Sequence, residues 1–270
     1  MDEGADDLRG RDDVDPRYVV PGLARGLFLL QVFNGQQSDL TLAELAEAAG
    51  LSRSSTYRLV YTLEKEGFLS RDPETRRYAL TSRVMTLGFA FLAARPLIEI
   101  VHPFLRRISQ ATGLAAHLVE LDGTETVYLA RVAPSVRVIS NLQIGMRLPA
   151  HSTVSGRVLL ADMGDEAVTG LYPRMLSDHP DQPPPPLDAL LDRAHEDAAR
   201  GHVMGESAFD PGIASFAAPV RNGAGQVVAA LNVIGPVPQM LMVGSETELQ
   251  AIVGAEAQNL SVQLGWREGP

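Results

Sequence analysis

The sequence predicts an α+β protein in which a small helical unit precedes a larger mixed domain. Three observations lead to this prediction. Helical periodicity with a glycine turn and a basic hairpin fills residues 21–80, an apolar helix follows at 81–96, and strands flanked by helices occupy 97–264. Short tails remain at 1–20 and 265–270. With 270 residues, the chain is long enough for two domains that each bury a core.

The N-terminal tail is acidic, with seven acids against three arginines in residues 1–20, and is expected to be disordered. It lacks the basic start and apolar run of a signal peptide, and no apolar stretch approaches the length of a membrane span. The chain contains no cysteine, which excludes disulfides, thiolate metal sites and cysteine nucleophiles. A cytoplasmic location without a membrane partner is therefore expected.

Three helices are expected in the first unit. Apolar residues recur at three- and four-residue spacing over residues 21–33. Thr41 with Glu44 three residues later has the pattern of a capping box at the start of a second helix, which stops at Gly50. A third helix is expected over residues 52–66. Helix, glycine turn and helix is the helix-turn-helix pattern.

A β-wing is expected after the third helix, where two short strands flank a turn at residues 72–74. Arginines lie on the tip and the returning strand of this wing, and small polar and basic residues fill the first half of the third helix. These are the side chains that reach base edges and phosphates. The residues expected to contact DNA are Thr41, Ser52, Arg53, Ser54, Ser55, Thr56, Tyr57, Arg58, Arg71, Arg76 and Arg77.

The charge distribution supports this hypothesis although the whole chain carries a formal charge of −10. Residues 21–95 carry nine bases and seven acids, whereas residues 96–270 carry eleven arginines and nineteen acids. The positive charge thus gathers on the unit that would bind DNA. An ordinary helical hairpin with a solvated basic face is the alternative interpretation.

A hydrophobic helix is expected over residues 81–94, with Ser82 as its N-cap and Arg95-Pro96 as its end. One side of this helix carries more apolar residues than an exposed linker would. This apolar stripe consists of Val84, Leu87, Gly88, Phe91 and Leu92. A dimer contact is the favoured interpretation, because a DNA site with two-fold symmetry requires a pair of DNA-binding domains. Packing onto the second domain of the same chain is the alternative.

The second domain is expected to begin with a helix over residues 97–112, kinked at Pro103. Alternation then predicts three antiparallel strands, AAHLVEL, TVYLARV and RVISNL. Further elements are expected in this order: a loop at Leu148-Pro149 leading into a helix near Ser152, helices at 165–172 and 187–200, a hairpin of SFAAPV and VVAALNVIG, and a last helix at 245–264.

At these residues the chain resembles the IclR family of bacterial transcriptional regulators. The resemblance runs from Pro21 to Leu264 and is carried by the winged helix together with the blocks RLPAHSTVSGRVLLA and AAPVRNGAGQVVAALNV. It implies an effector-binding domain of GAF-like topology, dimers that often pair into tetramers on DNA, and a response to small organic acids. Strings such as RGLFLLQVF and GRVLLA look closest to the subgroup that controls genes for protocatechuate, 4-hydroxybenzoate and other β-ketoadipate-pathway compounds.

The resemblance also implies an effector pocket. By position its residues are Arg137, Ser140, Leu148, His151, Ser152, Thr153, Val154, Ser155, Gly156, Glu206, Ile213, Ser215, Asn232 and Ile234. Backbone N–H groups of Thr153, Val154 and Ser155, at the start of a helix, would suit a carboxylate. Arg137 would either clamp that carboxylate or face solvent, and His151 would either contact the ligand or cap the loop. Glu206 is expected to have a structural role more than a ligand contact.

The sequence departs from the family where consecutive acids usually precede Pro211-Gly212. Only Glu206 and Asp210 are acidic there, which argues against an acid-lined or metal-assisted pocket. At position 232 the family often has a small residue, whereas this chain has Asn232. The asparagine side chain can both donate and accept hydrogen bonds.

An enzyme is not expected. The six histidines have no metal-ligand spacing and no GxSxG motif is present, so neither a metal site nor a cofactor is expected. The favoured function is a ligand-responsive transcriptional regulator of aromatic-acid or other organic-acid catabolism. Its expected partners are double-stranded operator DNA, a small carboxylate, and copies of itself in a homodimer or homotetramer. The alternative is a small-molecule sensor or scaffold whose winged helix mediates protein contacts.

Overall fold

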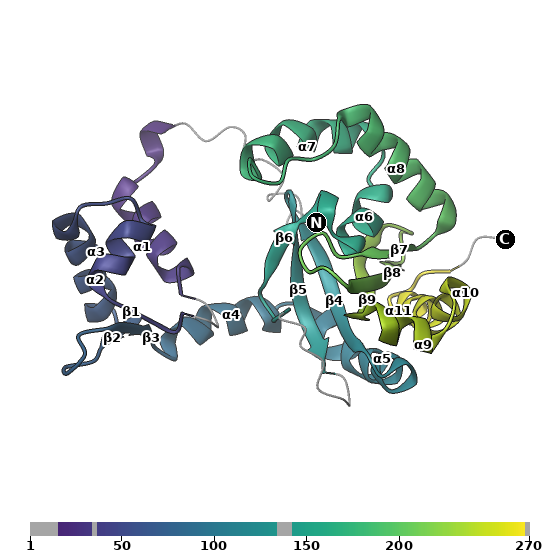
Figure 1. Cartoon of the computed structure of the whole chain (residues 1–270), viewed down its shortest axis with the longest axis horizontal. Helices are drawn as coiled ribbons and strands as arrows, with labels where there is room; N and C mark the ends of the chain where they lie inside the picture. Colours follow the sequence, from purple (N-terminus) through teal and green to yellow (C-terminus); the bar gives the residue numbers. More distant parts are fainter. Residues whose placement is uncertain (1–15, 34–36, 134–141, 268–270) are drawn as a thin grey trace, which may run out of the picture. The chain divides into compact units, whose positions relative to one another are not determined.

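The computed structural model describes residues 16–33, 37–133 and 142–267. The chain divides into two compact units, Met1–Ala94 and Arg95–Pro270 (Figure 1). The elements of the first unit are η1 (Pro16–Tyr18), α1 (Pro21–Gln31), β1 (Asp39–Leu40), α2 (Leu42–Ala48), α3 (Arg53–Lys65), β2 (Leu69–Arg71), β3 (Tyr78–Leu80) and α4 (Arg83–Ala93).

The first unit is a winged helix, as the sequence predicts. Helices α1, α2 and α3 enclose a core to which the sheet contributes, made of Leu29, Phe33, Leu40, Leu45, Val60, Leu69 and Tyr78. The hairpin of β2 and β3 forms the wing, and β1, which the sequence analysis did not predict, pairs antiparallel with β3. The fold class is therefore confirmed, with one additional strand.

Side-chain caps account for the helix boundaries. Thr41 Oγ1 accepts from the backbone N–H of Glu44 and the Glu44 carboxylate accepts from that of Thr41, so the predicted capping box is present. Ser52 caps α3 in the same way by accepting from the N–H of Ser55. Ser82 is the N-cap residue of α4, as predicted, but its side chain makes no capping hydrogen bond. The hydroxyl of Thr81 accepts from the N–H of Arg83 instead.

Helix α4 forms as predicted, but no residue of it is buried in the single chain. The side chains of Met85, Leu87 and Phe89 are 73%, 58% and 70% exposed. Val84 and Leu92 of the predicted stripe are half-buried. The apolar surface therefore extends around more of the helix than one stripe.

The second unit is a six-stranded antiparallel sheet with helices on both faces. Its elements are α5 (Pro96–Thr112), β4 (Ala115–Asp122), β5 (Glu125–Val132), β6 (Arg147–Pro149), η2 (Ala150–Ser152), α6 (Val154–Ala161), α7 (Asp165–Asp178), α8 (Leu187–Arg200), β7 (Val203–Glu206), β8 (Ile213–Arg221), β9 (Val227–Pro236), α9 (Val237–Val243), α10 (Glu246–Leu249), the π-helical η3 (Gln250–Gly254) and α11 (Ala255–Gln263). The strand order is β6-β5-β4-β9-β8-β7.

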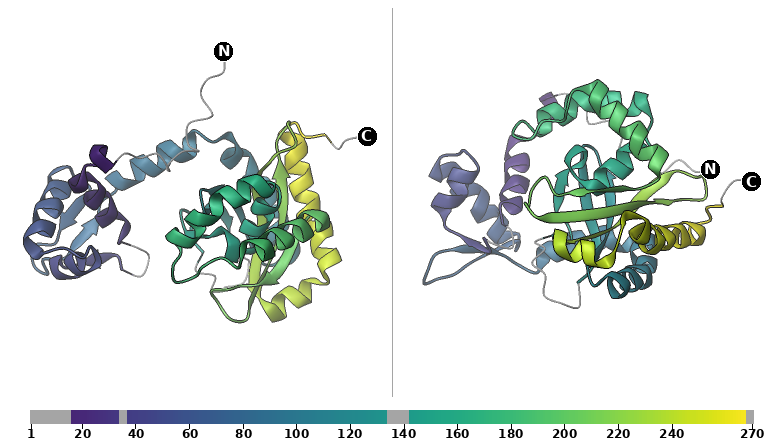
Figure 2. Two further views of the ribbon diagram at one scale, coloured as in Figure 1. Left: turned by 90° about the horizontal axis from the view of Figure 1, so that it is seen from above. Right: turned by 45° about the vertical axis from the view of Figure 1, so that its right-hand side comes forward.

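Alternation along the central strands separates two cores. Ala116 and Leu118 of β4 face the layer of α5 and the C-terminal helices, whereas Ala115 and Val119 pack in the core that α6 covers. The figures show α5 with α9–α11 on one face of the sheet and α6 with α7 and α8 on the other (Figure 1, Figure 2). This arrangement places the start of α6 over the centre of the sheet.

The predicted elements of this unit are mostly confirmed. Helix α7 extends to Asp178, beyond the predicted end, and β6, β7 and α9 were not predicted. The third predicted strand, RVISNL, spans residues 137–142. All of these residues except Leu142 lie outside the described residues. In the part of the chain that the structure describes, no single helix is long and apolar enough to cross a membrane. Only α4 and α5 taken together meet that criterion, by length and composition.

Candidate functional site

The first candidate site is the exposed face of α3. Ser52, Arg53, Ser54, Ser55, Tyr57 and Arg58 are all exposed there, as predicted for a DNA-contacting surface. The Ser52 hydroxyl is within hydrogen-bonding distance of the Ser54 and Ser55 hydroxyls, at 3.1 and 3.0 Å. These hydroxyls and the two arginines lie on the first two turns of α3, and the N-terminus of the helix carries positive potential.

Thr56 does not belong to this surface. Its side chain is fully buried, and its hydroxyl donates to the Ser52 carbonyl at 3.1 Å. The predicted contact between Thr56 and DNA is therefore corrected to a role in packing. Thr41 also serves the fold, because its hydroxyl is part of the capping box with Glu44.

The wing presents Arg71 and Arg76, which are both exposed. Arg71 lies over the Tyr78 ring, and Arg76 has a positive φ of 59° at the tip of the hairpin. The Asp72 carboxylate accepts from the backbone N–H groups of Glu74 and Thr75, bonds that shape the turn and lower the pKa of Asp72. These contacts fix the turn that lies between the two arginines.

Arg77 is engaged within the molecule. Its guanidinium pairs with Asp39 at 2.9 Å and with Glu44 at 3.1 Å, so two carboxylates already neutralise it. In the structure Arg77 links the wing, β1 and α2, and its DNA contact stays a prediction. Sequence spacing did not reveal this because Asp39 and Glu44 precede Arg77 by more than thirty residues.

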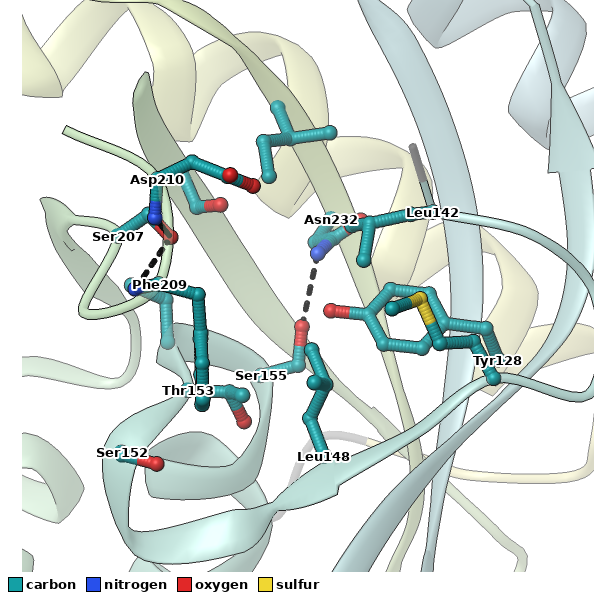
Figure 3. A pocket seen from close by; sticks show the side chains of 14 residues that line it. Tyr128, Leu142, Leu148, Ser152, Thr153, Ser155, Ser207, Phe209, Asp210 and Asn232 are labelled. Carbon is teal, nitrogen blue, oxygen red and sulfur yellow. Dashed lines mark hydrogen bonds between the residues drawn. The ribbon is translucent and has the colours of Figure 1, made fainter. Parts of the chain in front are cut away.

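The second candidate site is a cavity of about 60 Å³ between the sheet and the start of α6 (Figure 3). Eight predicted pocket residues line it: Leu148, Ser152, Thr153, Val154, Ser155, Ser215, Asn232 and Ile234. Six further lining residues were not predicted: Tyr128, Leu142, Met146, Ser207, Phe209 and Asp210. Arg137 and Ser140 lie outside the described residues.

Four predicted residues are not among those lining the cavity. The buried His151 bonds through Nε2 to the Gln182 carbonyl at 2.9 Å, which corresponds to the loop-capping alternative, and burial lowers its pKa. Gly156 packs so closely that a Cβ would meet the Ala150 carbonyl oxygen. Ile213 packs in the core beside the cavity, and Glu206 is exposed at the end of β7. The predicted ligand contacts of Gly156 and Ile213 are therefore corrected to packing, and Glu206 does not line the cavity, in keeping with the expectation that it is not a ligand contact.

One side of the cavity, here called the donor end, consists of Tyr128, Ser155 and Asn232. Asn232 and Ser155 are each 1% exposed, and the Asn232 amide donates to the Ser155 hydroxyl oxygen at 2.9 Å. In Figure 3 the Tyr128 hydroxyl points toward this pair. Burial raises the pKa of Tyr128, so the phenol keeps its proton and can donate a hydrogen bond.

The opposite side, here called the loop side, consists of Ser207, Phe209 and Asp210 (Figure 3). The Ser207 hydroxyl accepts from the N–H groups of Phe209 and Asp210, each at 3.1 Å, and so shapes this loop. Asp210 is the one charged side chain among the described residues that line the cavity.

Of the three backbone N–H groups predicted to face a carboxylate, that of Thr153 is already used, because it donates to the Ala150 carbonyl. The N–H of Gly156 is satisfied by the Thr153 hydroxyl at 3.0 Å. The N–H groups of Val154 and Ser155 are left at the start of α6, as expected for the first turn of a helix. Within the described ranges, no cluster of three or more histidines and acids has metal-binding geometry.

The comparisons with known proteins agree with this architecture. Residues 22–73 match the family model of the IclR helix-turn-helix domain, and residues 89–262 match that of the bacterial transcriptional regulator IclR C-terminal domain. The Pca regulon regulatory protein of Pseudomonas putida is 33% identical over 252 residues, which cover 93% of this chain and 86% of that protein.

Solved structures have the same fold. A putative transcriptional regulator from Rhodococcus aligns with a TM-score of 0.72 at 28% identity, over 91% of this chain and 98% of the other. An IclR homologue from Microbacterium hydrocarbonoxydans, solved in complex with 4-hydroxybenzoate, aligns with a TM-score of 0.71 at 24% identity, over 90% and 98%. At this lower identity the likeness concerns the fold. The relatives are transcriptional regulators, a non-enzymatic class. This chain belongs to the IclR family of bacterial transcriptional regulators.

Proposed function

We propose that this regulator binds operator DNA through the exposed residues of α3 and the wing, and a small organic carboxylate through the cavity of the second unit. Binding of the carboxylate would change the affinity for DNA. The protein would act in the cytoplasm, where bacterial operator DNA lies. The genes it controls would serve aromatic-acid or other organic-acid catabolism, a proposal supported by the 33% identity to the Pca regulon regulatory protein.

The proposal that the ligand is a carboxylate rests on the donor end of the cavity. Tyr128, Ser155 and Asn232 converge there from β5, α6 and β9, next to the first N–H groups of α6. Neutral donors and a helix N-terminus stabilise a carboxylate without a cationic partner. The apolar side chains of Leu142, Leu148 and Ile234 complete the wall, as in pockets for small organic ligands.

The size of the cavity restricts the ligand. A volume of about 60 Å³ is well below the roughly 150 Å³ of an apolar cavity that holds benzene. A short aliphatic acid requires little adjustment, whereas an aromatic acid requires the flexible Met146 or the loop-side Phe209 to move. Both classes belong in the test.

Calorimetry with 4-hydroxybenzoate, protocatechuate and pyruvate tests the effector site. The wild-type protein is expected to bind at least one of these acids, and Asn232→Leu is expected to lose that binding. Asn259→Leu provides a matched control, because Asn259 is exposed on α11. If none of the acids binds, or if Asn232→Leu binds as well as wild type, the proposed site is wrong.

We also propose that α4 mediates dimerisation. Its exposed Met85, Leu87 and Phe89 form an apolar surface that a second copy would cover. Sedimentation of Phe89→Glu is expected to show a shift from dimer or tetramer toward monomer. Val262→Glu, on the exposed side of α11, is the control and should leave the assembly unchanged. An unchanged assembly in Phe89→Glu would exclude α4 as the contact.

A further inference from the structure

A buried histidine lies directly behind the donor end. His117 of β4 is the cross-strand partner of Asn232 of β9 and is completely buried, but it is not among the residues that line the cavity. Its Nδ1 is 3.0 Å from Asn232 Oδ1, and its ring packs edge-on against Tyr128. His117 therefore contacts two of the three donor-end residues.

The contacts determine which ring nitrogen carries the hydrogen. In the structure Asn232 Oδ1 faces Nδ1, and because an amide oxygen only accepts, this orientation of the amide requires the hydrogen on Nδ1. The other nitrogen, Nε2, is buried without a partner among the described residues. A buried nitrogen without a hydrogen is the less costly form there, because unsatisfied buried N–H donors are rarer than unsatisfied acceptors. Burial also lowers the pKa of His117 to about 4, so the ring stays neutral.

The orientation of the Asn232 amide determines what Ser155 can offer. With Oδ1 held by His117, Nδ2 donates to Ser155 Oγ at 2.9 Å. The Ser155 hydroxyl hydrogen is then directed away from the amide. Among the described residues no hydrogen bond donated by this hydroxyl is found, and Ser155 lines the cavity. The hydroxyl hydrogen is thus available to a ligand.

The reverse arrangement would have the opposite effect. With the hydrogen on Nε2, the amide would turn over and donate to Nδ1, and Ser155 would donate to the amide oxygen. Ser155 would then present lone pairs to the cavity and repel a carboxylate. This arrangement leaves a buried Nε2–H without an acceptor.

We propose that His117 is a positioning residue that sets the hydrogen-bonding polarity of the pocket: its Nδ1–H orients Asn232, which makes Ser155 a donor toward the effector. The donor end then selects a carboxylate over the corresponding carboxamide, whose NH₂ would meet the same donors. This inference rests on the proposed carboxylate effector.

Nuclear magnetic resonance of protein labelled with ¹⁵N-histidine tests the relay without any ligand. The expected spectrum shows a neutral His117 with its hydrogen on Nδ1, and the signal is assigned by its absence from His117→Asn. A hydrogen on Nε2 would overturn the proposal.

Calorimetry tests the consequence for selectivity, with 4-hydroxybenzoate against 4-hydroxybenzamide and pyruvate against pyruvamide. Wild type is expected to prefer the acid, and His117→Asn, which places an amide donor near the position of Nδ1, to keep that preference. His117→Leu is expected to reduce the ratio of acid to amide affinity by about tenfold, the effect of losing one hydrogen bond to a charged group. If His117→Leu does not fold, Ser155→Ala removes the same donor and is expected to give the same loss.

The outcomes separate the two proposals. If wild type binds none of 4-hydroxybenzoate, protocatechuate and pyruvate, the proposed effector and this inference both fail. If wild type binds an acid but the ratio is unchanged in His117→Leu or Ser155→Ala, the effector proposal stands and the role of His117 is refuted.

Discussion

Arg157 of α6 and Asp197 of α8 are joined by two parallel charge-assisted hydrogen bonds, Nε to Oδ2 at 2.8 Å and Nη2 to Oδ1 at 2.7 Å. The Asp197 side chain is 1% exposed, whereas that of Arg157 is 22% exposed. Because α6 begins at the cavity, this ion pair holds the helix that supplies Ser155 and the backbone donors. Two-point pairs of this kind fix orientation as well as distance.

Replacing Asp197 by alanine is expected to destabilise the second unit by about 3 kcal/mol, because it leaves a largely buried guanidinium without its partner. Urea unfolding measures the change. Glu196→Ala is the matched control, since Glu196 pairs with Arg200 on the exposed side of the same helix and such pairs contribute roughly 0.5 kcal/mol. Equal losses in the two variants would contradict the structural role of the Arg157–Asp197 pair.

Arg53 and Arg77 are expected to differ in DNA binding. Arg53→Ala removes an exposed charge at the start of α3, so the affinity for a duplex selected by the wild-type protein should fall and its salt dependence should decrease by about one phosphate contact. Arg77→Ala removes a charge that Asp39 and Glu44 already neutralise, so the salt dependence should stay the same. Fluorescence anisotropy over a salt series measures both. The same slope in Arg53→Ala as in wild type would exclude Arg53 from the interface.

Gly156→Ala is expected to be destabilising. A Cβ at this position would lie 2.1 Å from the Ala150 carbonyl oxygen, so α6 would have to move away from η2, at a cost of roughly 1–3 kcal/mol. Gly170→Ala, in the middle of α7 with nothing within 4 Å, is expected to stabilise by about 0.5–1 kcal/mol through helix propensity. Thermal unfolding of the two variants gives opposite shifts if this packing is correct. An increase in thermal stability for Gly156→Ala would show that the close contact is absent.

The stability of the protein is expected to fall below pH 6.5 partly because of His117. Its pKa is about 4 in the folded state and about 6.5 when unfolded, so between these values only the unfolded chain takes up the proton. The resulting loss at pH 5 is about 2 kcal/mol relative to pH 7. His117→Asn lacks this contribution, whereas the lowered pKa of His151 acts in both proteins. Urea unfolding measures the free energy of unfolding of both proteins from pH 7 to pH 5. If it changes by the same amount in wild type and in His117→Asn, the assignment is refuted.

Local chemistry made the first unit predictable. The capping residues Thr41 and Ser52 act on N–H groups within three positions, so the starts of α2 and α3 can be located from the sequence alone. The burial of Thr56 had a signal that was overlooked. Thr56 lies one helical turn before the buried Val60, and that spacing places both residues on the inner face.

The pocket was predictable only in part. Residues in the blocks that carry the family resemblance, such as Ser155 and Asn232, were identified, whereas Tyr128 and Phe209 were not. Their positions depend on how β5 and the loop after β7 meet across the sheet, and no local pattern encodes that pairing. His117 and Asn232 are 115 positions apart, so their contact requires the register of β4 with β9. Alternation alone would place His117 on a face without identifying its partner.

The pairing of β4 with β9 also has a consequence for synthesis on the ribosome. Strands β4 and β9 lie at the centre of the sheet. Strand β4 ends at Asp122 and β9 begins at Val227, so more than a hundred residues separate them. The first unit is built from contacts close in sequence and can fold as it emerges, whereas the sheet of the second unit must wait until β9 has been made. During that interval the apolar faces of β4, β5 and α5 remain uncovered. A growing chain would therefore carry a folded winged helix before the second unit, which contains the effector cavity, has folded.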